Sequence, residues 1–421
     1  MGAFVIRGCE IYLGGAFVPA ELEVRGGVVT ALGGGIVPGE GASVYNFKNC
    51  IVVPGLADVH VHLREPGFSY KETVASGTRA AARSGYAALC AMPNLSPVPE
   101  DAATLAQELD IIRRDAVIDV LPYGAITRGQ KGAQLADMSA MSPYVCGFSD
   151  DGRGVQPREL MRAAMLEAKR LGRPIAAHCE DNSLLRGGYI HDGEYAKAHG
   201  HRGICSESEW GPIARDIELL RETGCAYHVC HISTAESAAL IRSAKREGLD
   251  ITCETAPHYL LLSDSDLQED GRFKMNPPLR SERDRLALIE ALRDGTIDIL
   301  ATDHAPHSAE EKSRGLAGSA FGITGLETAF PLLWTGLVEP GIISRERLVE
   351  LMSTAPARRF GIESGIEPGG PATFAVFETE TTYRIDPERF ASKGRATPFA
   401  GREVRGRCVL NVVRGREVWR A

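Results

Sequence analysis

The sequence predicts an α/β fold, a (β/α)8 barrel of the TIM type accompanied by a small β-sandwich built from both chain ends. Across the middle of the chain, apolar stretches of strand length alternate with amphipathic stretches of helix length, which is typical of a parallel α/β structure. Eight such strands can be drawn, and eight parallel strands close a barrel. Both chain ends instead carry short strand-like pieces between glycine-rich turns, which is the composition of antiparallel β-structure.

The two chain ends are expected to share one domain. The strand-like pieces before residue 50 lie at 4–7, 10–13, 21–24 and 28–32. Similar pieces return after residue 366, at 373–377, 382–385 and 408–414. We therefore expect residues 1–52 and 366–421 to form the β-sandwich domain and residues 53–365 to form the barrel.

The barrel strands are predicted from apolar runs bounded by polar or glycine-containing turns. We expect them at 52–58, 86–92, 117–123, 144–149, 174–179, 226–231, 250–254 and 297–302. Helical candidates lie between them at 71–84, 157–171, 208–222, 234–247 and 281–294. The segment 308–320 after the last strand is charged and contains glycine, a composition that suits a lid.

The composition argues against several classes of function. The chain carries 47 basic and 55 acidic side chains, a net charge of −8, and no basic cluster, which disfavours nucleic acid as its main partner. No apolar stretch reaches the ~18 residues of a membrane span, and the N-terminus lacks the features of a signal peptide. Ten cysteines without a C-x-x-C pair argue against a structural zinc knuckle and favour the reducing cytoplasm.

Polar side chains end five of the eight predicted strands, at the edge where barrels of this type hold their active sites. His60 and His62 are two residues apart on the first strand, so both imidazoles point to the same side and can grip a metal ion. Four histidines and two aspartates from these five strand ends are expected to converge on one point. Six nitrogen and oxygen ligands without a thiolate favour two metal ions that share a carboxylate.

Each of these residues alone has an ordinary structural explanation. Two histidines on a strand are more often plain strand residues, and Asp-Asp-Gly at 150–152 is most often a turn. Their joint occurrence at five strand ends favours the metal site. Cys179 and Cys230 alternate with the histidines, so we expect both to face the helix layer as small apolar residues.

Further groups near the strand ends suit a substrate. Arg64 is two residues after His62, so it is expected on the same side of the strand, and its guanidinium can bind a carboxylate through two hydrogen bonds. The others are Asn94, Asn276, His307, Phe321 and Gly322. Structural alternatives exist, because Asn94 could cap the turn after it and Asn276 could brace its own loop. The role of His258, which follows the seventh strand, is left open.

The motifs at 58–67 and 301–307 resemble two signatures of the amidohydrolase superfamily, and within it of the dihydroorotases. Stretches at 91–94, 274–280, 321–328 and 397–399 match the same pattern, so the resemblance covers essentially the whole chain. It implies reversible hydrolysis of (S)-dihydroorotate to N-carbamoyl-L-aspartate, a step of de novo pyrimidine (UMP) synthesis, with two zinc ions per chain.

The resemblance also implies a role for each site residue. One zinc would be held by His60, His62 and Asp303, and the other by His178 and His231. The substrate contacts would be His62, Leu63, Arg64, Asn94, Asn276, His307, Phe321 and Gly322. A metal-bound hydroxide would attack the ring amide, and Asp303 would act as general base and then as general acid toward the departing nitrogen.

One position departs from a common superfamily pattern. Many members bridge the two metals with a carboxylated lysine after the fourth strand, whereas this chain has Asp150 and Asp151 there. This resembles the bacterial dihydroorotases that use an aspartate bridge, and it argues against hydantoinases. Asp151 is the better candidate, because Asp150 would point the other way on a regular strand.

The sequence is compatible with two alternative functions. The first is another cyclic amidohydrolase, a hydantoinase or an allantoinase. The second is a non-catalytic dihydroorotase-like scaffold for aspartate carbamoyltransferase, although such proteins typically lose metal ligands. The expected partners are the small-molecule substrate and a second copy of the chain in a homodimer, and a complex with aspartate carbamoyltransferase stays open.

Overall fold

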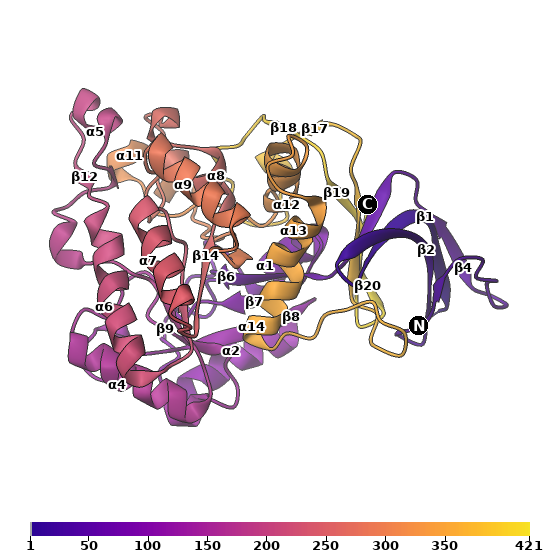
Figure 1. Ribbon diagram of the computed structural model, residues 1–421, viewed down its shortest axis with the longest axis horizontal. Helices are drawn as coiled ribbons and strands as arrows, with labels where there is room; N and C mark the ends of the chain where they lie inside the picture. Colours follow the sequence, from indigo (N-terminus) through magenta and orange to yellow (C-terminus); the bar gives the residue numbers. More distant parts are fainter. Residues whose placement is uncertain (1) are drawn as a thin grey trace.

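The computed structural model describes residues 2–421 and has two parts (Figure 1). A helix-covered barrel occupies one end, and a curved sheet that contains both chain termini occupies the other end (Figure 1). Among the helices that the structure describes, none has the length and apolar character needed to cross a lipid bilayer.

The barrel contains eight parallel strands arranged in chain order, as the sequence predicts. They are β6 (Leu56–Val61), β7 (Tyr86–Ala91), β8 (Asp119–Ala125), β9 (Gly147–Ser149), β10 (Ile175–Ala177), β13 (Tyr227–Val229), β14 (Ile251–Thr255) and β15 (Ile299–Leu300). The first strand meets the segment after the last one, because the backbone N–H of His62 donates to the carbonyl of His304 at 2.9 Å. This closure brings the ends of β6 and β15 together at the carboxyl edge of the barrel.

Helices follow the strands and cover the outside of the barrel (Figure 1). The longer ones are α1 (Val74–Arg83), α2 (Ala102–Asp115), α4 (Arg158–Leu171), α6 (Glu207–Thr223), α7 (Ala235–Arg246) and α9 (Glu282–Arg293). The five helices predicted from the amphipathic pattern all form. Local chemistry starts several of them: the Thr73 hydroxyl accepts from the N–H of Ser76 at the start of α1, which satisfies an otherwise unpaired donor.

Shorter elements complete the barrel domain. The short helices are α3 (Met138–Met141), α5 (Glu194–His199), α8 (Pro257–Leu261), α10 (Ala309–Lys312), α11 (Gly315–Gly318), α12 (Ala329–Leu333), α13 (Arg345–Val349) and α14 (Ala355–Phe360). A two-stranded sheet pairs β11 (Ile190–His191) with β12 (Gly203–Ile204). The segment 308–320 therefore contains two short helices, α10 and α11.

Both chain ends contribute to one mixed sheet with the strand order β20-β19-β16-β5-β1-β2-β3, and β4 pairs with β1. Its strands are β1 (Phe4–Leu13), β2 (Ala16–Arg25), β3 (Val28–Gly33), β4 (Ser43–Asn46), β5 (Cys50–Pro54), β16 (Phe374–Glu378), β19 (Arg407–Val413) and β20 (Arg416–Arg420). Leu22 and Val24 of one half share a buried cluster with Phe374 and Leu410 of the other half. The sandwich-like core is thus enclosed by a single curved sheet.

Three details differ from the predicted strands. The strand expected at 52–58 is two strands that separate at Gly55, where the chain leaves the end sheet (β5) and enters the barrel (β6). A Cβ at Gly55 would lie 2.5 Å from the Cβ of Ala87, so this crossing needs glycine. The pieces at 4–7 and 10–13 form one strand with an irregularity between Ile6 and Cys9. The piece at 382–385 pairs outside the sheet, as β17 (Tyr383–Arg384) with β18 (Glu403–Val404).

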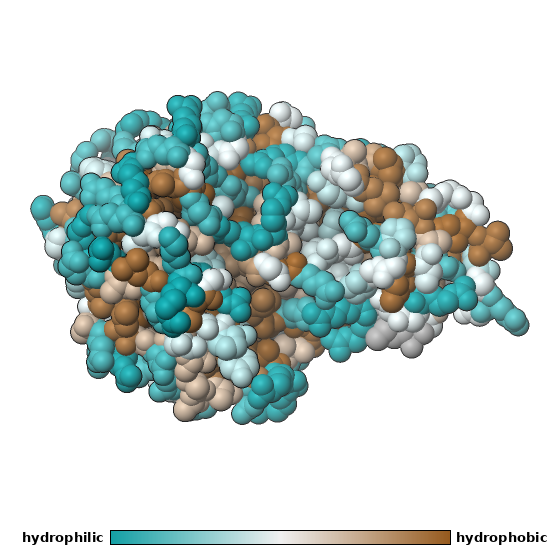
Figure 2. Space-filling model, turned by 60° about the horizontal axis from the view of Figure 1, so that its bottom comes forward, coloured by the Kyte–Doolittle hydropathy of each residue, from teal (hydrophilic) through white to brown (hydrophobic). Residues whose placement is uncertain are grey.

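The surface of the end sheet is more apolar than most of the barrel surface in the view of Figure 2. Three exposed valines belong to this part of the chain, Val18 in β2, Val44 in β4 and Val37 in the loop between β3 and β4. The candidate ligands, by contrast, are all buried in the barrel.

Candidate metal centre

The strand ends bring four of the predicted ligands into one cluster around His60 and His62. The Nε2 atom of His60 lies 3.2 Å from Oδ1 of Asp151 and 3.6 Å from Oδ1 of Asp303. The Nε2 atom of His62 lies 3.2 Å from Oδ1 of Asp303 and 3.5 Å from Oδ2 of Asp151. Both imidazoles of the His-x-His pair therefore face the same two carboxylates, as their shared strand face predicts.

The remaining two predicted ligands approach the same aspartate from the other side of the barrel. Nδ1 of His178 and Nε2 of His231 each lie 3.5 Å from Oδ1 of Asp151, and 2.9 Å from one another. The carboxylate of Asp151 is thus within 3.5 Å of all four histidines. It therefore lies between the pair His60 and His62 and the pair His178 and His231.

Asp150 points away from this cluster. Its Oδ1 accepts hydrogen bonds from the backbone N–H groups of Ile126 at 2.8 Å and Thr127 at 3.1 Å, and its Oδ2 accepts from the Thr127 hydroxyl. Burial raises the pKa of Asp150 to about 6 despite these bonds. Asp150 therefore anchors the loop after β8, whereas Asp151 faces the histidines.

The residues of the cluster fit a metal ion. Three buried atoms, His60 Nε2, Asp151 Oδ1 and His178 Nε2, have no hydrogen-bond partner among the described residues, although such atoms are normally satisfied in proteins. Ligand atoms lie within 4.8 Å of one another in the groups His60–His62–Asp303 and His60–Asp151–His231. Imidazole nitrogen and carboxylate oxygen are the donor set that catalytic zinc uses.

The charges of the cluster also favour a cation. Burial raises the pKa of Asp151, but the charge of His60 and the nearby imidazoles of His178 and His231 outweigh it and hold that pKa well below its usual range. Burial lowers the pKa of His60, but the charges of Asp151 and Glu254 raise it well above its ordinary value. The carboxylates thus attract positive charge to the place where the ligand atoms meet.

Glu254 accepts a hydrogen bond from His60 and so orients its imidazole ring. Its Oε1 accepts from Nδ1 of His60 at 2.6 Å, and its Oε2 lies 3.0 Å from Nε2 of His228. This hydrogen bond places a proton on Nδ1 of His60, so Nε2 is the nitrogen that would bind a metal ion once its own proton is displaced. Glu254 was not among the residues predicted from the sequence, although a carboxylate at the end of the predicted seventh strand follows the same pattern as the other strand ends.

Asn94 contacts the imidazole ring of His62 in a similar way. Its Oδ1 lies 2.8 Å from Nδ1 of His62, and its Nδ2 lies 3.5 Å from Oδ2 of Asp151. Asn94 was expected near the substrate or as a turn cap. Here it contacts two candidate ligands and so fixes the orientation of the His62 ring.

Three cluster or neighbouring residues have left-handed backbone conformations that non-glycine residues rarely adopt. They are Arg64 (φ 63°), His231 (φ 32°) and Asp303 (φ 46°), and each lies just after a barrel strand. Such conformations cost on the order of 1–3 kcal/mol each and concentrate at functional sites. The chain therefore turns sharply where these side chains must face the cluster.

The expectation for the two cysteines was half wrong. Cys179 packs in the main core, with its Sγ 3.5 Å from the hydroxyl of Tyr227. Cys230 instead lies in the barrel interior, where its sulfur forms a potential ligand group with His60 and Glu254. The strand β13 ends before Cys230, so strict two-residue alternation no longer applies there. Burial raises the pKa of the Cys230 thiol to about 12.

The predicted substrate contacts on the β15 side of the site form one group. Nη2 of Arg64 lies 3.3 Å from Nε2 of His307, and that nitrogen lies 2.8 Å from the carbonyl of Phe321. Burial and the charge of Arg64 lower the pKa of His307 to about 3, so this imidazole is neutral. Burial lowers the pKa of Arg64 to about 10, which leaves its guanidinium charged at neutral pH.

The other predicted contacts are placed differently. Asn276 donates from Nδ2 to Oε1 of Glu180 at 2.8 Å, and Oε2 of Glu180 lies 3.5 Å from Nε2 of His178. The side chain of Leu63 packs in the main core beside Gly77 of α1, so a substrate contact at this position would involve its backbone. His258 is buried, its Nε2 has no partner among the described residues, and burial lowers its pKa to about 4.

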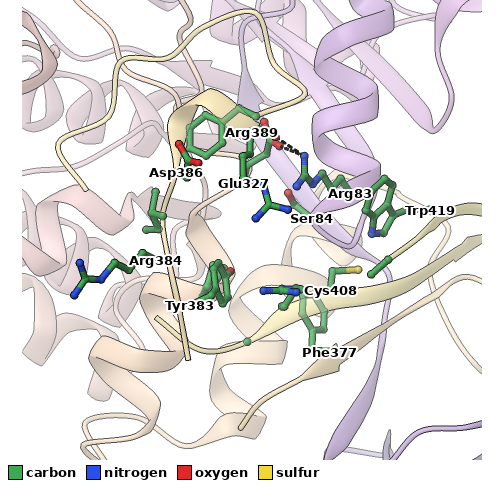
Figure 3. A pocket seen from close by; sticks show the side chains of 16 residues that line it. Arg83, Ser84, Glu327, Phe377, Tyr383, Arg384, Asp386, Arg389, Cys408 and Trp419 are labelled. Atoms are coloured by element: carbon green, nitrogen blue, oxygen red, sulfur yellow. Dashed lines mark hydrogen bonds and ion pairs between the residues drawn. The ribbon is translucent and has the colours of Figure 1, made fainter. Parts of the chain in front are cut away.

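A separate cavity of about 330 Å³ lies between α1 and the segment that carries β17 and β18 (Figure 3). Its wall includes Arg83 and Glu327, which pair at 3.7 Å, and the rings of Tyr383 and Trp419 (Figure 3). None of the six candidate ligands lines this cavity. The metal centre is therefore distinct from it.

The chain is similar to known proteins along its whole length. A family model described as dihydro-orotase-like matches residues 49–237. Dihydroorotases of Bacillus caldolyticus and Geobacillus kaustophilus are 46% and 47% identical over 422 and 423 residues, which is 100% of this chain and 99% of each relative. Among solved structures, the L-hydantoinase (dihydropyrimidinase) of Arthrobacter aurescens superposes with a TM-score of 0.88 at 25% identity, covering 100% of this chain and 96% of that one.

The two kinds of similarity carry different information. The hydantoinase shares the barrel and the mixed end sheet, and so supports the fold. The dihydroorotases share nearly half of all residues from end to end. Because this full-length identity is almost twice that to the hydantoinase, the chain belongs to the dihydroorotase family of the amidohydrolases.

Proposed function

We propose that this dihydroorotase hydrolyses (S)-dihydroorotate reversibly to N-carbamoyl-L-aspartate, with two zinc ions held by its buried cluster. His60, His62 and Asp303 would hold one ion, His178 and His231 the other, and Asp151 would bridge them. The observation that supports this most strongly is the carboxylate of Asp151, which lies within 3.5 Å of all four histidines. Bound zinc lowers the pKa of a coordinated water to about 7 and polarises a carbonyl, which supplies the nucleophile and the electrophile.

Asp303 is the residue proposed to move the proton. Burial raises its pKa, but a hydrogen bond from His62 and the charge of His60 lower it below the usual value, so the carboxylate is ionised at neutral pH. An ionised carboxylate at this place can accept the proton of the attacking water and pass it to the departing ring nitrogen. The same group thus serves as base in the first half of the reaction and as acid in the second.

Arg64 and His307 are proposed to bind the carboxylate that the substrate carries. The guanidinium of Arg64 donates from Nε to the carbonyl of Pro306 at 3.2 Å, which fixes its direction, and the neutral His307 lies beside it. A positioned guanidinium binds a carboxylate more strongly than a neutral donor does. This pocket favours a ring with a carboxylate over the uncharged ring of a simple hydantoin.

The complete set of ligands argues against a non-catalytic scaffold. All six candidates are present, buried and directed at one another. A role in the cytoplasm is supported by the ten cysteines, all of which are free thiols. The homodimer and the complex with aspartate carbamoyltransferase stay predictions.

Metal analysis on purified protein, paired with a dihydroorotate hydrolysis assay on the same sample, tests the proposal. We expect about two zinc ions per chain, loss of activity on chelation and recovery when zinc is added back. About one zinc with full activity would keep the function and remove Asp151 from the bridging role. No activity with both sites filled by zinc would contradict the function itself. A panel with hydantoin and allantoin tests the two rival substrates.

A further inference from the structure

Lys312 is a buried lysine that the proposed reaction does not use. It is the last residue of α10, and its ammonium donates to three backbone carbonyls, those of Lys274 at 3.0 Å, Ala320 at 2.8 Å and Gly322 at 2.7 Å. A lysine ammonium has three donors, so all of them are used. Among the described residues, no carboxylate lies within ion-pair distance of this nitrogen. Burial and the charge of Lys274 lower the pKa of Lys312 to about 7.

The three carbonyls belong to two backbone segments that carry proposed substrate contacts. Lys274 lies two residues before Asn276, and Ala320 and Gly322 flank Phe321. The segments also meet directly, because the N–H of Gly322 donates to the carbonyl of Lys274 at 3.1 Å. The ammonium of Lys312 thus sits at the junction of the two segments and fixes one against the other.

The backbone at Gly322 leaves no room for a side chain. Gly322 has a φ of 129°, and a Cβ on it would lie 2.6 Å from the carbonyl oxygen of Ala305. Its neighbour Phe321 contributes the carbonyl that lies 2.8 Å from Nε2 of His307. A shift of this backbone would therefore move the partner that orients His307.

A buried ammonium without a carboxylate partner is costly, and carbonyl hydrogen bonds offset only part of that cost. This ammonium instead holds carbonyls of two segments at once. We infer that Lys312 is a positioning residue for substrate binding, which acts by holding the backbone at Gly322 and the Asn276 segment in register.

This inference rests on the substrate contacts assigned to Asn276, Phe321 and Gly322 in the proposed function. It also changes the interpretation of the segment 308–320, which the sequence suggested as a lid. In the structure that segment is tied down from both sides, because Nζ of Lys274 donates to the carbonyl of Ala317 at 2.9 Å.

The test compares Lys312→Met, which keeps the length of the side chain and removes all three donors, with the matched control Lys197→Met. Lys197 is an exposed lysine on α5 whose ammonium lies 3.3 Å from Glu194. For Lys312→Met we expect KM to rise at least about tenfold in both reaction directions, with a smaller change in kcat and unchanged zinc content, since the three carbonyls that lose their donor belong to the segments that carry the substrate contacts. For Lys197→Met we expect wild-type kinetics.

A second variant, Lys312→Gln, keeps amide donors in case the methionine variant does not fold. Unchanged KM in whichever variant folds would overturn the inference, and so would a loss of activity that follows a loss of zinc. Failure of both variants to fold would assign Lys312 to folding and would also contradict the positioning role. Wild-type protein that holds zinc but does not hydrolyse dihydroorotate would instead contradict the proposed function.

Discussion

The carboxylate of Asp151 lies 3.2 Å from Nε2 of His60, while the adjacent Asp150 turns its carboxylate to the backbone of Ile126 and Thr127. Two neighbouring aspartates of equal chemistry thus have opposite surroundings. One faces four histidines, and the other holds a loop. This difference makes the pair a direct test of which aspartate bridges the metals.

We expect Asp151→Asn to lower kcat by about 100-fold or more and to reduce the zinc content, because the amide removes a charged ligand shared by both ions. Asp150→Asn is the matched control, since its amide oxygen still accepts from the two backbone N–H groups. It should retain zinc and nearly all activity. Zinc analysis and steady-state kinetics on both variants measure this, and equal losses in the two would contradict the assignment.

Asp303 is predicted to carry the proton. Replacing it with asparagine keeps an oxygen near His62 and removes the ability to accept a proton, so kcat should fall by about 10²–10⁴-fold. Some zinc should remain, because His60, His62 and the second group of ligands are intact. The readout is kcat together with zinc per chain. A near-normal kcat would take Asp303 out of proton transfer.

Arg64→Met tests recognition of the substrate carboxylate. Loss of a charge-assisted hydrogen bond worth about 1.5–3 kcal/mol should raise KM by about 10- to 100-fold for both dihydroorotate and N-carbamoyl-L-aspartate. Arg314→Met is the control, because Arg314 is exposed and pairs with Glu310 on the surface. If KM for Arg64→Met equals the control value, the guanidinium has only a structural role.

Glu254→Gln tests the support behind His60. A carboxylate that orients a ligating histidine typically contributes 10- to 100-fold in metal affinity or activity, so we expect a fall of about that size in zinc affinity. Asp298→Asn is a suitable comparison, because Asp298 pairs with Lys245 and has no contact with the cluster histidines. Competition with a zinc chelator measures the affinity, and wild-type affinity in Glu254→Gln would show that His60 needs no such support.

Most of the barrel and the four candidate ligand histidines were predictable from local patterns. His60 lies in β6 and His62 directly follows it, and both side chains face the cluster as two-residue alternation predicts. His178, His231 and Asp303 follow strand ends, where the barrel topology brings distant parts of the chain together. The alternation failed at Cys230, which lies beyond the last residue of β13 and beside a left-handed residue.

Other features depend on contacts between residues far apart in the sequence. The pairing of Glu254 with His60 joins residues 194 positions apart, and a carboxylate in a buried strand looks the same in sequence with or without such a partner. The break at Gly55 is set by the closeness of Ala87, and the role of Lys312 is set by carbonyls on two other segments. No local sequence pattern predicts these contacts between distant residues.

The sequence by itself determined the order of strands and helices, the candidate ligands and the family, because these follow from side-chain periodicity and from motifs in continuous stretches of chain. The tertiary structure alone decided that Asp151 rather than Asp150 faces the histidines, that Glu254 and Asn94 orient them and that Lys312 holds the Gly322 backbone. These contacts depend on the residue at which each strand ends and on the direction of the turn that follows it. They also depend on groups that meet only after the barrel closes.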